Sequence, residues 1–178
     1  SVNNQVVHGI PGERVLLEGD IVKVDVGAVL GGLHADAARS FPVGRISSEA
    51  EKLLATTRTA LDAGLRQAVV GNRVSDISAA VQSMVEEAGY SVVRDYVGHG
   101  VGRDLHEDPQ VPNYVQGRSS LLLREGMTLA VEPMVNEGTH EVVVLEDKWT
   151  VCTRDGKLSA NFEDTVAITD AGPQILTR

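Results

Sequence analysis

Two stretches of the chain carry apolar residues at helical spacing. Residues 47–70 open with Ser48 and Glu51 at capping-box spacing, which predicts a helix. Its apolar stripe is Leu53, Leu54, Leu61, Leu65 and Val69. A second helix is predicted over about 75–88, from Ser75 to Gly89. Its stripe is Ile77, Val81, Met84 and Val85. Both stripes, Met84 included, are interpreted as core rather than as cofactor contacts, so the helices should cover one face of a sheet.

Residues 20–41 read instead as two strands around the dipeptide Gly31-Gly32, which predicts a hairpin with a glycine turn. With the two glycines as the central turn residues, Asp25 faces Ala38 across the strands. Asp36 lies two residues from Ala38, so it shares a face with Asp25 and sits diagonal to it.

Two carboxylates on such a diagonal, with backbones about 7–8 Å apart, can close on a shared cation cluster. The alternative is that one of the aspartates only points to solvent from an edge strand. We expect Val22, Val24 and Val26 to mark the opposite, buried face. Asp25 would then lie on the less apolar face, where a ligand or another layer would have to cover it.

Shorter apolar runs predict further strands, several of which end in a functional group. Residues 2–8 end at His8, before the loop that begins at Pro11. Residues 128–131 lead into Glu132. Residues 159–169 hold Glu163 among apolar and β-branched neighbours, where a carboxylate is costly unless it is paired or bound to a metal. Two more short strands are expected on either side of the turn Asp147-Lys148.

The stretch 95–114 holds His99 and His106 among several glycines. Glycines at this density disfavour a helix and allow backbone to approach closely, so we expect a strand and a turn that bring both imidazoles to one place. A histidine beside glycines is often only a turn residue. The glycine spacing also lacks the features of a dinucleotide-binding fingerprint.

The composition fits one globular domain over residues 1–178, with 42% hydrophobic and 23% charged residues. No stretch approaches the apolar length of a membrane span. The net charge of −9 argues against a nucleic-acid footprint, and bound cations can neutralise part of it. The single cysteine, Cys152, forbids an internal disulfide and fits a reducing compartment.

Four carboxylates and one imidazole thus stand in strands or at strand ends. They are Asp25, Asp36, His99, Glu132 and Glu163. An oxygen-rich set with one nitrogen suits a pair of divalent ions such as Mn, Co, Fe or Zn, about 3.5–4 Å apart and bridged by carboxylates. No single member of the set is diagnostic.

The motifs that carry these residues are specific, and they run collinearly along nearly all of the chain. They are V-H-G-I-P-G at 7–12, the 20–41 hairpin, G-H-G-V-G-R-D-L-H-E-D-P at 98–109, E-P-M-V at 132–135 and S-A-N-F-E-D-T at 159–165. Together they resemble type I methionine aminopeptidases. The resemblance implies an α+β pita-bread fold, with an antiparallel-rich curved sheet and helices on its outer face.

The resemblance also implies roles for the site residues. Asp25 would hold one metal ion, His99 and Glu132 the other, and Asp36 and Glu163 would bridge the two. His8 and His106 would lie outside the metal shell and contact the scissile peptide; with Glu132 they are the expected catalytic residues. The implied reaction is hydrolysis of the first peptide bond by metal-activated water, which removes an N-terminal methionine when the next residue is small.

The resemblance implies that the substrate is a nascent polypeptide or peptide. It also implies that the enzyme is monomeric and cytoplasmic and associates with ribosomes. Members of the family carry a further N-terminal segment, and we expect the chain to be cut from something longer. Asn161 stands where the family more often has glutamine, and Asp164 where histidine is common. His34 and His140 are not expected to take part.

Three other readings are weighed against this resemblance. X-Pro aminopeptidases and prolidases use the same five ligand types, although V-H-G-I-P-G and E-P-M-V match them less well. A type II methionine enzyme would carry a large insertion between His106 and Glu132, and none is present. An inactive, peptide-binding relative would be expected to lack ligands, whereas all five are present.

Overall fold

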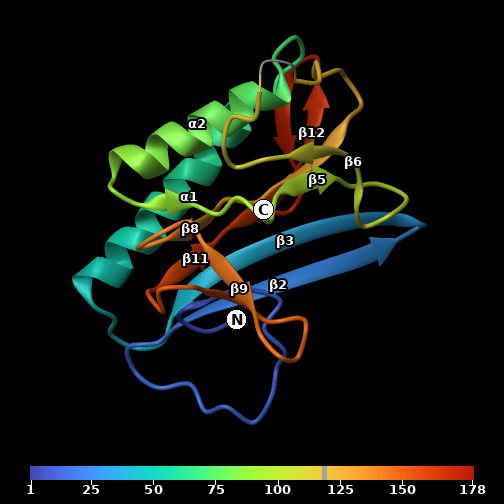
Figure 1. Cartoon of the computed structure of the whole chain (residues 1–178). Coiled ribbons are helices and arrows are strands. Elements are labelled where there is room, and N and C mark those ends of the chain that lie inside the picture. Colours follow the sequence, from blue (N-terminus) through green and yellow to red (C-terminus); the bar gives the residue numbers. More distant parts are fainter. Residues whose placement is uncertain (118–119) are drawn as a thin grey trace.

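The computed structural model describes residues 1–117 and 120–178. Within that part of the chain, two helices lie on one side of a curled antiparallel sheet (Figure 1). The helices are α1 (Ser48–Arg66) and α2 (Val74–Glu87). The expected α+β class, with helices on one face of an antiparallel-rich sheet, is confirmed.

The largest sheet of the described residues has seven strands. Its order is β2 (Ile21–Leu30), β3 (Leu33–Pro42), β12 (Glu163–Thr169), β7 (Thr128–Val131), β5 (Gly98–Gly100) and β6 (Glu107–Val111), with β13 (Gly172–Ile175) paired to β12. One smaller sheet joins β1 (Gln5–Val7), β10 (Val151–Thr153) and β9 (Val142–Val144). Another joins β11 (Ser159–Asn161), β8 (Met134–Asn136) and β4 (Ser91–Val92). The strand expected over 159–169 is therefore divided at Phe162 between two sheets.

The β2–β3 hairpin has the predicted register. Gly31 and Gly32 both have positive φ values, 60° and 81°, as a tight two-residue turn requires. Asp25 pairs with Ala38, and Gly27 pairs with Asp36. The two aspartates therefore lie on one face, on the expected diagonal.

The expected burial of the valine face of β2 is wrong. Val24 and Val26 are 45% and 56% exposed, and Val22 is only half-buried. The strand lies at the edge of the sheet, and its covered face carries Ile21 and the buried Lys23 instead. There the Lys23 side-chain nitrogen donates hydrogen bonds to the backbone carbonyl oxygens of Asn3 and Ser159, each at 2.7 Å.

The two helices form where the apolar stripes predicted them, with small differences at their ends. Ser47 rather than Ser48 caps α1, and its hydroxyl accepts a hydrogen bond from the Ala50 amide. Helix α1 ends at Arg66, short of the predicted end, so Val69 lies beyond it. The stripe residues Leu53, Leu61, Leu65, Ile77, Val81 and Val85 are buried, while Leu54 and Met84 are partly buried.

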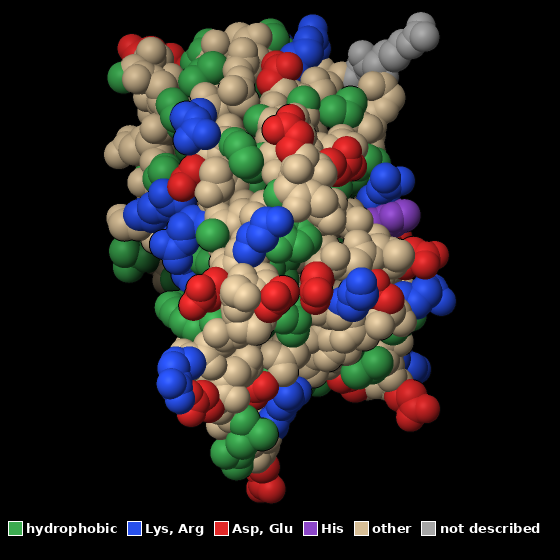
Figure 2. Space-filling view, turned by 90° about the vertical axis from the view of Figure 1, so that its left-hand side faces the viewer, with side chains coloured by type: hydrophobic (Ala, Val, Ile, Leu, Met, Phe, Trp, Pro, Cys, Tyr) green, Lys and Arg blue, Asp and Glu red, His purple; other side chains and the backbone are tan. Residues whose placement is uncertain are grey.

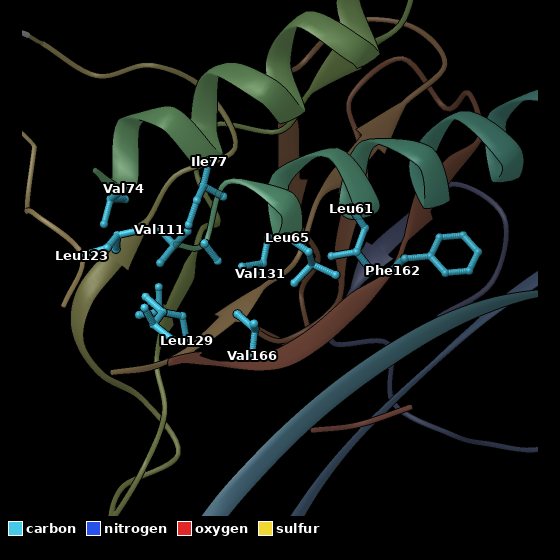
Figure 3. Close-up of a cluster of buried hydrophobic side chains, with 12 residues drawn as sticks. Leu61, Leu65, Val74, Ile77, Val111, Leu123, Leu129, Val131, Phe162 and Val166 are labelled. Carbon is cyan, nitrogen blue, oxygen red and sulfur yellow. The ribbon is translucent and has the colours of Figure 1, made fainter. Parts of the chain in front are cut away.

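The buried face of α1 packs on β7 and β12, and α2 packs beside α1 and against β4 and β6. Figure 3 shows Leu61 and Leu65 of α1 above Val131 and Val166, with Ile77 of α2 beside them. This core holds one face of the sheet against the helices, so functional groups on β12 must project from the other face.

The surface on the helix side carries acidic and basic side chains interspersed with scattered apolar ones (Figure 2). None of the helices in residues 1–117 and 120–178 is long and apolar enough to cross a membrane.

Helices α1 and α2 pack closely at Gly64 of α1. A Cβ atom at this position would lie 2.8 Å from Val81 Cγ2 and 3.3 Å from Ile77 Cγ2. Gly64→Ala should therefore destabilise the protein by about 1–3 kcal/mol, although alanine is favoured over glycine in a helix by about 1 kcal/mol. Urea denaturation measures the difference.

The matched control is Ala55→Gly on the exposed side of α1. It reports the propensity effect alone and should cost about 0.5–1 kcal/mol. A Gly64→Ala variant more stable than the parent would contradict the close packing.

Candidate metal centre

Five successive strands of the large sheet each contribute one of the predicted ligands. Asp25 comes from β2, Asp36 from β3, Glu163 from β12, and His99 from β5. Glu132 follows the last residue of β7. Residues far apart in the sequence thus meet on one sheet because their strands are neighbours in it.

The ligand atoms of these residues form overlapping groups. One group is Asp25, Asp36 and Glu163, and a second is His99, Glu132 and Glu163; within each, the atoms lie within 4.8 Å of one another. His99 Nε2 is 3.5 Å from Glu132 Oε1 and 4.0 Å from Asp36 Oδ2. Glu163 belongs to both groups, so its carboxylate is shared between them.

Glycines on both sides of His99 allow three strands to meet there. A Cβ atom on Gly98 would lie 2.3 Å from the carbonyl oxygen of Ala130, and one on Gly100 would lie 2.3 Å from that of Asp108. Neither position tolerates a side chain without movement of the backbone. The expected close approach of backbone in this stretch is confirmed.

The imidazole of His99 is held in one orientation. Its Nδ1 donates to the Gly100 carbonyl oxygen at 2.9 Å, which leaves Nε2 free toward the carboxylates. Burial lowers the pKa of His99. The neutral ring with an unprotonated Nε2 is the form that binds a metal ion.

The carboxylates repel one another in a partly dry environment. Burial, followed by the charge of Asp36, raises the pKa of Asp25 to about 6. Burial and the charges of Glu132 and Asp36 raise the pKa of Glu163 to about 10, and burial with Asp25 and Asp36 raises the pKa of Glu132 well above its usual value. In each case burial is the largest cause, and the negative charges of neighbouring carboxylates add to it.

Glu163 also has an unsatisfied atom. Its Oε1 is buried and has no hydrogen-bond partner among the residues that the structure describes. A divalent cation would supply both the positive charge and the coordination that this oxygen lacks. The residues present therefore fit a divalent metal.

The two remaining predicted histidines lie at the exposed side of this cluster. The rings of His106 and His99 are 4.3 Å apart between centroids, and His106 also forms a possible ligand group with His99 and Asp36. His8 has a positive φ of 60°. Partial burial and the charge of His106 lower the pKa of His8.

A cavity of about 610 Å³ runs from His8 to Asp25 along the edge of β2. Its walls include the apolar side chains of Ile10, Leu16 and Val24. A peptide lying in this cavity would reach the carboxylates from the side of His8.

Several residues at the site were not identified from the sequence. Tyr96 and Trp149 both meet the His8 ring edge to face, with centroids 5.5 Å and 6.1 Å away. Thr165 binds the backbone of Asp36, accepting from its N–H and donating to its carbonyl oxygen. Strand alternation puts Thr165 on the same face as Glu163, so the sequence pattern could have identified Thr165 as a site residue. No pattern in the sequence pointed to Tyr96 or Trp149.

The two other histidines take no place in the ligand groups found among the described residues. His34 Nδ1 lies 3.3 Å from the Gly102 carbonyl oxygen, in the loop between β5 and β6. His140 precedes β9 and is half-buried. The expectation that they stand apart is consistent with these positions.

Residues 1–170 match metallopeptidase family M24. A methionine aminopeptidase of Clostridium perfringens is 56% identical over 177 residues, which cover 99% of this chain and 71% of the relative. The crystal structure of a methionine aminopeptidase from Thermotoga maritima superposes with a TM-score of 0.97 at 52% identity, covering all of this chain and 72% of that one.

A more distant structure separates the branches of the family. A prolidase from Pyrococcus furiosus is 25% identical with a TM-score of 0.75, covering 96% of this chain and 45% of the prolidase. Both superpositions confirm the pita-bread fold of this chain. Its sequence identity is much higher to the methionine aminopeptidase than to the prolidase. The chain belongs to metallopeptidase family M24 and, within it, to the methionine aminopeptidases.

Proposed function

We propose that this chain binds two divalent metal ions and hydrolyses the first peptide bond of a polypeptide that begins with methionine and continues with a small residue. One observation carries the proposal: five neighbouring strands bring four carboxylates and one imidazole together, with a buried glutamate oxygen left unpartnered among the described residues. The 56% identity to a methionine aminopeptidase supports the choice of substrate.

In this proposal Asp25 would hold one ion, His99 and Glu132 would hold the other, and Asp36 and Glu163 would be shared by both. The membership of Glu163 in two ligand groups supports its bridging role. Bound divalent ions of the Mn, Co, Fe or Zn type would lower the pKa of a water molecule and polarise the carbonyl that it attacks.

The two outer histidines handle protons and developing charge. His106, next to His99, is placed to donate a hydrogen bond to the carbonyl oxygen of the scissile bond as negative charge develops there. The lowered pKa of His8 favours its neutral imidazole, which would accept a proton and return it at the substrate amide.

Tyr96 and Trp149 give the site an apolar surface beside His8. Aromatic faces make favourable contacts with a thioether, so this surface suits a methionine side chain. We place the methionine there, with its α-amine toward the carboxylate cluster, whose charge attracts an ammonium group.

The setting of the reaction follows from the same proposal. All five ligands lie on one continuous sheet, which supports a single catalytic domain over residues 1–178. The single cysteine supports a reducing, cytoplasmic compartment, where nascent chains at the ribosome would be the substrates of a monomeric enzyme.

A peptide panel tests the proposed function. Metal-reconstituted protein is incubated with peptides that begin Met-Ala, Met-Lys and Ala-Pro and with an Xaa-Pro dipeptide, and the products are identified by mass spectrometry. Loss of methionine from the Met-Ala peptide alone is expected. Cleavage only before proline would assign the chain to the prolidase type of activity, and binding without cleavage would favour an inactive relative.

Metal removal should make the stability depend on pH. The folded, metal-free protein holds protons on Asp25 and Glu163, with pKa values of about 6 and about 10, that the unfolded chain releases at lower pH. Stability of the metal-free protein should therefore fall as the pH rises from about 5 to about 8, and added Mn²⁺ should reverse the fall. Thermal unfolding after chelation, with and without Mn²⁺, measures both.

Asp36→Asn is the matched variant for this experiment. It removes one negative charge from the cluster, so it should raise the melting temperature of the metal-free protein at neutral pH. It should also reduce the increase in melting temperature that Mn²⁺ produces. A metal-free parent protein whose stability rises over this pH range would contradict the mutual repulsion of the carboxylates.

His106→Ala should separate a proton-handling role from a ligand role. Metal affinity measured by calorimetry should stay unchanged, while turnover falls by about 10²-fold or more. His34→Ala, at the start of β3 and outside the ligand groups, is the control and should change neither quantity. Loss of metal binding in His106→Ala would make His106 a ligand instead.

A further inference from the structure

A buried aspartate directly follows the proposed bridging ligand Glu163. Asp164 is fully buried, and both of its carboxylate oxygens accept hydrogen bonds. Oδ1 accepts from Arg39 Nη2 at 2.5 Å and from the Thr177 hydroxyl at 2.8 Å. Oδ2 accepts from Arg178 Nε at 2.8 Å. Two arginines therefore share one buried carboxylate.

Arg39 does more than neutralise Asp164. Its Nη1 donates to the main-chain carbonyl oxygen of Glu163 and, at 2.8 Å, to that of Ala38. One planar guanidinium thus binds the backbone of the proposed ligand and the side chain of the next residue at once. Arg178 differs, because its other hydrogen bond goes to Asp62 on α1 at 2.7 Å.

The pairing of β3 with β12 is short, which makes these contacts important. The register joins Glu163 to Ala38 and Asp164 to Ala37. Next to these pairs, the Thr165 hydroxyl holds both backbone groups of Asp36, at 2.9 Å and 2.8 Å. The two proposed bridging ligands are therefore fixed relative to each other by a few main-chain contacts.

The carboxylate of Glu163 needs this support from its backbone. Its Oε1 has no partner in the described part of the chain, so that oxygen is not anchored by a donor. Alternation along β12 points Asp164 to the opposite face, with Val166 and the helix core. Asp164 is thus behind the ligand cluster and not a member of it.

We propose that Arg39, with Asp164 as its counter-ion, is a positioning residue that fixes the main chain of Glu163 for metal binding. The inference rests on the proposed function, since it assigns Glu163 to the metal ions. A purely structural ion pair is the alternative. Buried ion pairs often contribute little net stability, so a role in geometry accounts better for the burial of Asp164.

The test compares Arg39→Met with Arg178→Met. Each variant removes one arginine from Asp164 and leaves the other, but only the first loses the contact with the Glu163 carbonyl oxygen. Mn²⁺ affinity is measured by calorimetry, and kcat and KM are measured on a Met-Ala peptide, at a temperature where circular dichroism shows every variant folded.

Arg39→Met should weaken Mn²⁺ binding by about 10-fold or more and lower kcat with little change in KM, as expected when support for a metal ligand is lost. Arg178→Met should lower only the melting temperature. Equal Mn²⁺ affinity and kcat in the two variants would overturn the positioning role.

Arg39→Lys keeps the positive charge but loses the planar guanidinium group. Its Mn²⁺ affinity and kcat should therefore lie between those of the parent protein and Arg39→Met. It also serves if Arg39→Met does not fold, because parent-like Mn²⁺ affinity in Arg39→Lys would then count against the geometric role. A parent protein that neither binds Mn²⁺ nor cleaves the peptide would overturn the proposed function first, and the inference with it.

Discussion

Mutual repulsion among four carboxylates is the constraint on which this structure depends. Asp25, Asp36, Glu132 and Glu163 converge with a single imidazole, and burial with neighbouring charge raises the pKa of Glu163 to about 10. Such a cluster is unfavourable unless protons or cations compensate it. The fold must therefore supply enough packing energy elsewhere to hold these groups together, and the helix-covered core on the other face of the sheet supplies it.

The two faces of β12 show how one strand serves both purposes. Val166 and Ile168 enter the core under α1, while Glu163 and Thr165, one residue out of phase, face the site. A shift of one residue in register would exchange the faces and bury apolar side chains in the metal site. The hydrophobic core thus also sets which carboxylates meet.

Local pattern was enough to predict the hairpin geometry and the candidate ligands. The glycine turn fixed the diagonal of Asp25 and Asp36 because hairpin register follows from the turn alone. Alternation did not reveal which face of β2 is covered, because it distinguishes two faces without saying what packs on either. The sequence also could not predict that Arg39 pairs with Asp164. The two residues meet only because β3 and β12, which are far apart in the sequence, are neighbours in the sheet.

Metal ligands have a requirement that ordinary buried carboxylates do not have. A donor that anchored Glu163 Oε1 would satisfy the buried oxygen but would also compete with an ion for the same lone pairs. Precision must then come from the main chain. Thr165 on the backbone of Asp36 and Arg39 on the backbone of Glu163 meet this need in the same way, because each fixes a strand position and leaves the oxygens that face the cluster available.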